Sequence, residues 1–128
     1  MPRTILIIDD DESIREIAKA SLELTTGWDV MTASSGLEGI AAAGTNHPDA
    51  ILLDVMMPDM DGPAVFRGLR GQLDAPAIPV LFLTAKIQKS DLREFKDLGV
   101  QGVISKPFDP LKLAGLVALL LAWPTVTE

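Results

Sequence analysis

The residues best suited to chemistry are acidic, and each stands where a short apolar run ends. Asp9 and Asp10 follow the run Thr4–Ile8, and Asp54 follows Ala50–Leu53. Continuous runs of Ile, Leu and Val of this length are typical of parallel strands buried on both faces. Because the carboxyl ends of parallel strands meet at one edge of the sheet, we expect the three carboxylates to converge there.

Two further polar residues come at the ends of later apolar runs. Thr84 follows Pro79–Leu83, and Lys106 lies just beyond Gly102–Ile104. Clustered carboxylates repel one another unless a cation lies among them, and oxygen ligands without His or Cys suit a hard ion such as Mg²⁺. A metal, a lysine and a hydroxyl together suit a phosphoryl group. Asp54, at the end of the central strand, is the expected nucleophile, forming an acyl phosphate.

The elements that must position these residues alternate along the chain. Trp28–Ala33 is a weaker candidate for a fifth strand, at the sheet edge. The alternation predicts an α/β fold, a doubly wound flavodoxin-like (βα)5 arrangement around a five-stranded parallel sheet in the order 2-1-3-4-5. Helical periodicity predicts helices over Ser13–Leu24, Leu37–Ala43, Pro63–Leu73, Ser90–Leu98 and Pro110–Ala122.

Capping residues mark the expected ends of these helices. Gly27 and Gly99 follow periodic stretches and suit left-handed C-caps. Ser90 and Asp109 are the expected N-caps of the last two helices, and Pro63 suits a first helical turn. These signals agree with five helices between the strands.

Composition excludes several other classes of protein. The 128 residues, 48% of them hydrophobic, suit one globular domain. The absence of cysteine excludes disulfides, zinc fingers, iron–sulfur clusters and thiol nucleophiles, and the single His47 excludes a multi-histidine metal site. The net charge of −7 argues against direct nucleic-acid binding. No apolar stretch reaches the roughly 18 residues of a membrane span, and the start is not a signal peptide, so the cytoplasm is the default compartment.

Four motifs follow one another along the chain: ILIIDDDESIRE, LLDVMMPDMDG, PVLFLTA and ISKPF. Together they resemble the response-regulator receiver domain of two-component signalling, and they are similar to the stand-alone chemotaxis receiver. The resemblance implies a receiver domain over residues 1–123, a short tail over 124–128 and no output domain. It implies phosphoryl transfer from a histidine kinase or a histidine phosphotransfer protein, a downstream protein target, and no enzymatic activity on outside metabolites.

The resemblance also implies a role for each site residue. Asp54 matches the phosphoacceptor, Thr84 matches the switch hydroxyl that moves toward the phosphoryl group, and Lys106 matches the lysine that pairs with it. The bond between Lys106 and Pro107 matches a cis peptide bond, which is accessible before proline. The implied Mg²⁺ ligands are Asp10 directly, Asp9 through water, Asp54, and the backbone carbonyl of Met56.

The sequence departs from the receiver pattern at two places. Val103 stands where many receivers carry Tyr or Phe, so an aromatic side chain that swings inward as Thr84 moves is missing. Met56 and Lys86 stand two residues past Asp54 and Thr84, at positions that tune the loss of phosphate. Met56 has no group to position an attacking water, so we expect a long-lived phosphorylated state.

The last predicted helix has an unusually apolar surface. Over Pro110–Trp123 its only charged residue is Lys112. An apolar face that the sheet does not cover usually marks an interface, so we expect a homodimer or a docked partner on this face of the helix. The resemblance to receivers implies that the surface used is the one formed by helix 4, strand 5 and helix 5. The stripe expected to cover the sheet is Leu113, Leu116, Val117 and Leu120.

Two other functions stay open. A phosphorylation-independent receiver-like scaffold is the main alternative, and Val103 is its support. A hydrolase with an aspartyl phosphate, like the haloacid-dehalogenase phosphatases, needs an acid–base carboxylate two residues after the nucleophile. That position holds Met56, which argues against it.

Overall fold

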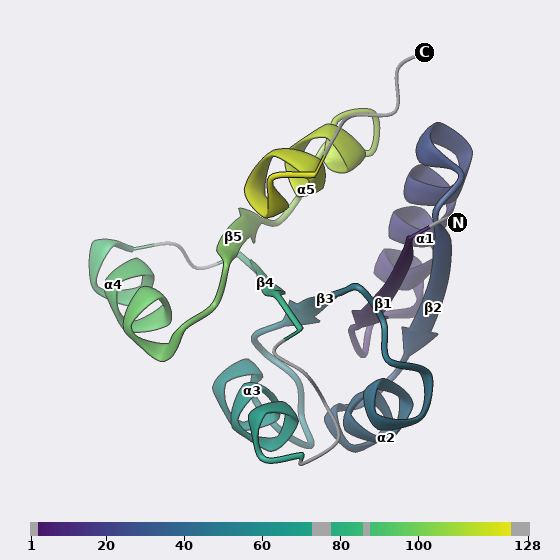
Figure 1. The fold of residues 1–128 in the computed structure, drawn as a ribbon. Helices are drawn as coiled ribbons and strands as arrows, with labels where there is room; N and C mark the ends of the chain where they lie inside the picture. Colours follow the sequence, from purple (N-terminus) through teal and green to yellow (C-terminus); the bar gives the residue numbers. More distant parts are fainter. Residues whose placement is uncertain (1–2, 73–77, 86–87, 124–128) are drawn as a thin grey trace.

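One parallel sheet with helices on both faces organises the molecule, as the computed structural model shows for residues 3–72, 78–85 and 88–123 (Figure 1). The strand order β2-β1-β3-β4-β5 confirms the predicted flavodoxin-like α/β fold. The strands are β1 (Thr4–Ile8), β2 (Asp29–Ala33), β3 (Ala50–Asp54), β4 (Val80–Thr84) and β5 (Gly102–Ser105). The helices are α1 (Glu12–Thr26), α2 (Gly36–Asn46), α3 (Gly62–Arg70), α4 (Lys89–Leu98) and α5 (Leu113–Leu121).

The strands are buried on both faces, which is why they appear in the sequence as continuous apolar runs. Alternate residues of a strand point to opposite faces. Ile5 and Ile7 of β1 pack in a cluster with residues of α1 and α5, while Leu6 and Ile8 pack in a second cluster with residues of α2, α3 and α4. All four side chains are fully buried, so β1 has no polar face before its carboxyl end.

The helix ends confirm some predicted caps and correct others. Gly27 and Gly99 are left-handed C-caps, with φ of 77° and 111°. The prediction of Ser90 as an N-cap is wrong, because α4 begins at Lys89 and its N-cap is Gln88. Asp91, in the first turn, accepts a hydrogen bond from the Gln88 backbone N–H at 3.3 Å, so its carboxylate helps to satisfy the amides at the start of α4.

The start of the last helix also differs from the prediction. Asp109 is not an N-cap, because α5 begins at Leu113 and Lys112 precedes it as the cap residue. The Asp109 carboxylate accepts instead from the backbone of Leu111 at 2.9 Å, and its carbonyl accepts from the backbone of Lys112. These bonds stabilise a turn over the residues that the sequence assigned to the first helical turn.

The face that α5 turns to the sheet differs from the predicted stripe. Leu116 is 36% exposed and Leu120 is only partly buried, so the predicted stripe is wrong at Leu116. The residues of α5 that are buried are Leu113, Val117, Ala118 and Leu121. The predicted and the observed stripe both satisfy helical periodicity, and in a helix that is apolar on every side the sequence pattern cannot distinguish them.

Trp123, just after α5, is anchored by aromatic contacts. Trp123 packs edge-on against Trp28, with ring centroids 5.3 Å apart, and the Arg3 guanidinium lies 4.2 Å from the Trp123 ring centroid.

In the part of the chain that the structure describes, no helix is long and apolar enough to cross a membrane. Three predicted features lie outside the described residues: the end of a helix at Leu73, the position of Lys86, and the tail 124–128.

Candidate functional site

Three carboxylates converge at the carboxyl edge of the sheet, where β1 and β3 are neighbours. Asp9 directly follows β1 and is fully buried, while Asp54 ends β3 and is 4% exposed. Asp10 is exposed at the same edge, and one oxygen from each of the three carboxylates lies within 4.8 Å of the others. The predicted convergence of Asp9, Asp10 and Asp54 is therefore confirmed.

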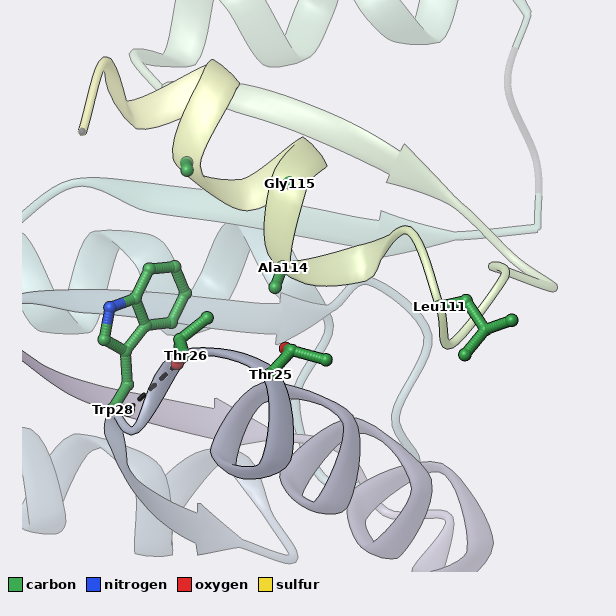
Figure 2. Close-up of a pocket in the computed structure, with 7 residues that line it drawn as sticks. Thr25, Thr26, Trp28, Leu111, Ala114 and Gly115 are labelled. Atoms are coloured by element: carbon green, nitrogen blue, oxygen red, sulfur yellow. Dashed lines mark hydrogen bonds between the residues drawn. The ribbon is translucent and has the colours of Figure 1, made fainter. Parts of the chain in front are cut away.

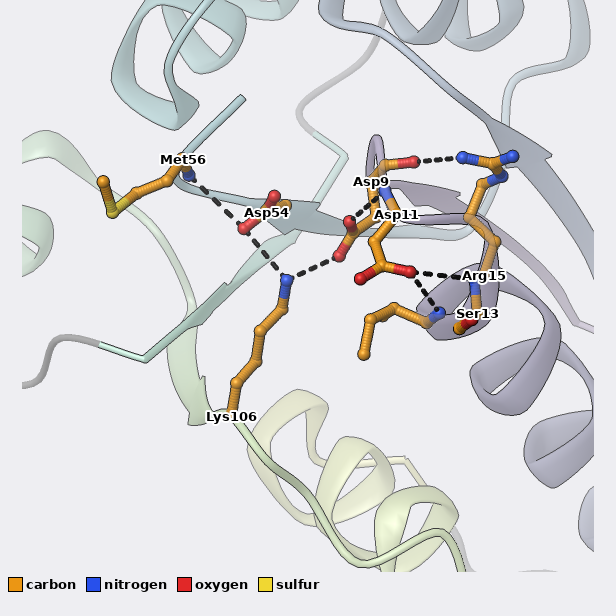
Figure 3. Close-up of polar contacts among 8 residues, drawn as sticks. Asp9, Asp11, Ser13, Arg15, Asp54, Met56 and Lys106 are labelled. Carbon is orange, nitrogen blue, oxygen red and sulfur yellow. Dashed lines mark hydrogen bonds and ion pairs between the residues drawn. The ribbon is translucent and has the colours of Figure 1, made fainter. Parts of the chain in front are cut away.

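Lys106 joins two of these carboxylates from the loop after β5. Its Nζ donates to Asp9 Oδ2 at 2.7 Å and lies 3.1 Å from Asp54 Oδ1 (Figure 3). The bond from Lys106 to Pro107 is cis, as the resemblance implied. A single ammonium thus bridges two carboxylates that lie far apart in the sequence, one directly after β1 and the other at the end of β3.

Backbone contacts hold the Asp9 turn in place. Asp9 Oδ1 accepts from the backbone of Asp11 at 2.9 Å, and Arg15 Nη1 donates to the Asp9 carbonyl at 2.8 Å (Figure 3). The Asp11 carboxylate in turn caps α1 by accepting from the backbone of Ser13 at 2.8 Å. Sequence reasoning missed Arg15, because a basic residue on the first turns of a helix carries no signal of what it reaches.

Thr84 and Met56 complete the residues that the sequence singled out. Thr84 ends β4 and is 2% exposed, and the register pairs Asp54 with Leu83, so Thr84 lies one residue further along the neighbouring strand. The Met56 backbone N–H donates to Asp54 Oδ1 at 3.3 Å. The Met56 side chain is 58% exposed and points away from the carboxylates (Figure 3).

The electrostatics of the site show a shortage of positive charge. Burial and, after it, the nearby Asp9 charge raise the pKa of Asp54, Lys106 opposes both effects, and the net result is a pKa of about 6. Burial alone would lower the pKa of Lys106, but its hydrogen bonds and charge attraction to Asp9 and Asp54 outweigh burial, so the net shift is upward. Lys106 is therefore a persistent cation, and one ammonium does not offset three carboxylates.

The donor set fits a hard divalent cation. The converging atoms are carboxylate oxygens, with no nitrogen or sulfur ligand among Asp9, Asp10 and Asp54. Such oxygen sets suit Mg²⁺, which binds through one or two carboxylates and keeps several waters. A divalent cation beside Asp54 would also counteract the burial and the Asp9 repulsion that raise the pKa of that carboxyl.

A pocket separate from the acidic site lies on the face of the sheet that α1 and α5 cover. It measures about 180 Å³ between the end of α1 and the start of α5, and Thr25, Trp28 and Ala114 are among its lining residues (Figure 2). Within the described part of the chain, no charged side chain lines it. This pocket therefore lacks the groups that phosphoryl chemistry requires.

Comparisons with known proteins agree with this site. The sequence profile of the Response regulator receiver domain matches residues 5–118. The alkaline phosphatase synthesis transcriptional regulatory protein PhoP of Bacillus subtilis is 40% identical over 121 residues, which cover 94% of this chain and 49% of that protein. The DNA-binding dual master transcriptional regulator RpaA of Synechocystis is 42% identical over 121 residues, which again cover 94% of this chain and 49% of that protein. The chain thus spans about half the length of these curated relatives.

Solved structures show the same similarity. The Vibrio cholerae chemotaxis protein CheY4 superposes with a TM-score of 0.87 at 32% sequence identity, covering 94% of this chain and 99% of that one. A response regulator from Chloroflexus aurantiacus superposes with a TM-score of 0.84 at 33% identity, over 95% and 99% of the two chains. The likeness therefore extends over nearly the whole of each structure.

Proposed function

The chain belongs to the response regulator receiver domain family, and from this membership we propose that Asp54 is its phosphoacceptor. The domain is a signalling phosphoacceptor rather than an enzyme that acts on outside substrates. The observation that carries the assignment to Asp54 is the position of its carboxylate. It lies 3.1 Å from the Lys106 ammonium and beside the carboxylates of Asp9 and Asp10.

Each side chain has a proposed task in the transfer. An Asp54 oxygen bonds to phosphorus as the bond between phosphorus and the donor's histidine nitrogen breaks, and the imidazole is the leaving group. The Lys106 ammonium pairs with a phosphoryl oxygen, and the Thr84 hydroxyl donates a hydrogen bond to another. Asp9, with its carbonyl held by Arg15, keeps Lys106 directed at the reacting carboxylate.

The acidic triad is typical of the Mg²⁺ site of receivers. We propose that Asp10 and Asp54 hold the ion directly, that Asp9 acts through water, and that the Met56 carbonyl is the remaining protein ligand. When bound, the ion neutralises charge on Asp54 and on the incoming phosphoryl oxygens. The raised pKa of Asp54 supports the proposal, because it reflects burial and, after it, repulsion from Asp9, and a divalent cation would offset both by favouring the ionised carboxylate.

Membership of the family implies a histidine kinase as partner. We propose that the direct donor is such a kinase or a histidine phosphotransfer protein, and that the receiver unit spans residues 1–123 with a tail over 124–128. The signal passes to a downstream protein, or to a second copy of the chain, on the face of α4, β5 and α5. A groove of about 450 Å³ between α4 and β5, lined by Leu92 and Val103 among others, supports this surface.

The lifetime of the phosphorylated state follows from Met56. Its thioether, two residues after Asp54, offers no hydrogen-bonding group that would position an attacking water. We propose that the aspartyl phosphate of this chain is long-lived. The loss of radiolabelled phosphate from the isolated chain measures this directly, and a decay within seconds would contradict it.

Intact mass spectrometry after incubation with acetyl phosphate and Mg²⁺ tests the assignment of Asp54. One phosphoryl adduct is expected on the unaltered chain and on the control Asp97→Asn, which changes an exposed carboxylate of α4. No adduct is expected on Asp54→Asn, or on the unaltered chain with a chelator. A folded chain that binds Mg²⁺ yet forms no adduct would favour the scaffold function that Val103 keeps open.

A further inference from the structure

A groove adjoins the acidic site without belonging to it. It measures about 520 Å³ and lies between the loop after β3 and the helix α4. Its floor is apolar, because Met57 and Phe95 line it and are 8% and 5% exposed. Phe95 packs edge-on against Phe82 of β4 with ring centroids 4.8 Å apart, so the core supports the floor from below.

Met56 is the exposed part of this apolar lining. Its side chain is 58% exposed and points away from the carboxylates of the acidic site (Figure 3). A methionine adapts its shape to a partner more readily than a branched side chain does. The groove therefore offers a place where an apolar side chain of another protein would be removed from water.

The rim of the groove is negatively charged. Asp61, Asp91 and Glu94 line it, and among the residues that the structure describes no Lys or Arg does. Asp61 accepts from the backbone of Ala64 at 2.8 Å and Asp91 accepts from the backbone of Gln88 at 3.3 Å. These bonds hold two of the carboxylates at fixed places on the rim, on a chain whose net charge is −7.

We propose that this groove docks a basic amphipathic segment of a partner protein. An apolar side chain of the segment enters between Met56 and Phe95, and its Lys or Arg side chains contact Asp61, Asp91 and Glu94. Charge complementarity selects this partner, since an acidic segment would be repelled by the rim and an uncharged one would gain nothing from it. The docking goes beyond the proposed phosphoacceptor function and does not require a phosphoryl group on Asp54.

Met56 connects the groove to the acidic site. Its backbone N–H donates to Asp54 Oδ1 at 3.3 Å, while its side chain lines the groove. A partner that moves the Met56 side chain therefore acts on the residue bonded to Asp54, and phosphorylation and docking are expected to affect one another equally. This coupling rests on the proposed function, whereas the docking itself does not.

The test uses the full chain and a fluorescein-labelled helical peptide with leucines on one face and lysines on the other. Two matched peptides replace the lysines by glutamates or the leucines by serines. Fluorescence anisotropy is expected to show binding of the first peptide, weakening with salt, and at least about tenfold weaker binding of the other two. Equal binding of the glutamate peptide would overturn the proposal.

Two charge reversals of equal size locate the binding. Glu94→Lys changes an exposed residue on the rim, and Glu16→Lys changes an exposed residue of α1 on the other side of the sheet. Glu94→Lys is expected to weaken binding about tenfold and Glu16→Lys less than about twofold, because exposed charges act over about a Debye length. If the two variants weakened peptide binding equally, only the overall charge of the chain would attract the peptide, and the proposal would be contradicted.

Amide chemical shifts and a second variant complete the test. The peptide is expected to shift amides of the loop after β3 and of α4, and shifts centred on α1 and α5 would contradict the proposal. Asp97→Asn removes an exposed carboxylate of α4 that does not line the groove, and it is expected to change the affinity for the peptide less than about twofold. If the unaltered chain forms its phosphoryl adduct but binds no peptide, the groove proposal fails while the phosphoacceptor function stands.

Discussion

Asp54 is a carboxylate whose ionised form the folded protein disfavours. It is 4% exposed, and burial together with the nearby Asp9 raises its pKa to about 6 even though Lys106 lies 3.1 Å away. A nucleophile needs the ionised form, so the same surroundings that bury Asp54 also create the demand for a divalent cation. At the scale of single residues, stability and function are therefore opposed at this position.

The stability of the metal-free chain should record this opposition. Because the folded pKa of Asp54 is raised from 3.8 to about 6, the contribution of this group to stability is fully present below about pH 4 and lost as the pH rises through 6. Asp54→Asn removes that loss. We expect its stability advantage over the unaltered chain to grow by about 2 kcal/mol between about pH 4 and pH 7.5, measured by urea unfolding in chelator.

Mg²⁺ provides the complementary measurement. Because the ion favours ionised Asp54, adding it at neutral pH should stabilise the unaltered chain and narrow its difference from Asp54→Asn. The control Asp97→Asn should follow the unaltered chain at every pH. An advantage of Asp54→Asn that stays constant from acid to neutral pH would show that charge burial is not its cause.

At the scale of the elements, the place of a glycine in its helix determines the effect of replacing it. Gly27 ends α1 in the left-handed conformation at φ 77°, whereas Gly115 lies inside α5. A Cβ added at either residue would meet no atom within 4 Å, so steric crowding contributes to neither substitution. Only backbone conformation distinguishes the two positions.

Alanine substitutions at these glycines should have effects of opposite sign. Gly27→Ala forces a side chain into a left-handed conformation and should destabilise the protein by about 1 kcal/mol. Gly115→Ala improves helix propensity and restricts the unfolded chain, so it should stabilise by about 0.5–1 kcal/mol. Urea unfolding of both variants measures the difference, and effects of the same sign would contradict the conformational explanation.

At the scale of the whole molecule, large apolar side chains are exposed on α4 and α5. Leu92 is 39% exposed, Leu116 is 36% exposed and Leu119 is 75% exposed. No charged residue lies within α5, so bringing two copies together here would not bury a charge of that helix. This surface is consistent with the proposed homodimer through α4, β5 and α5.

A charge placed on this surface should weaken self-association. Leu119→Lys is expected to lower the association constant of the dimer by about tenfold or more, measured by sedimentation velocity. The free energy of unfolding should change little, because the Leu119 side chain is already mostly exposed. Leu37→Lys is the matched control, since Leu37 is 67% exposed on α2, across the sheet. Equal effects of the two variants, or an unaltered chain that stays monomeric with and without acetyl phosphate, would contradict the dimer.

The strands and the acidic site were predictable from local sequence. A strand buried on both faces must be apolar throughout, so each strand is recognisable in the sequence as a continuous apolar run. Parallel pairing then brings the residues that follow these runs to one edge of the sheet. Asp9, Asp10 and Asp54 meet there as expected. Lys106 follows the same rule, because the loop after β5 opens at that edge.

Contacts between distant residues were decided by tertiary packing. The stripe of α5 that faces the sheet could not be predicted, because several stripes of that helix are equally apolar and only the shape of the opposing core selects Leu121 over Leu116. The bond from Arg15 to the Asp9 carbonyl and the groove between Met56 and Phe95 likewise depend on how two elements approach each other. Local patterns record burial, whereas the choice among equally buried arrangements is made by close packing of the whole chain.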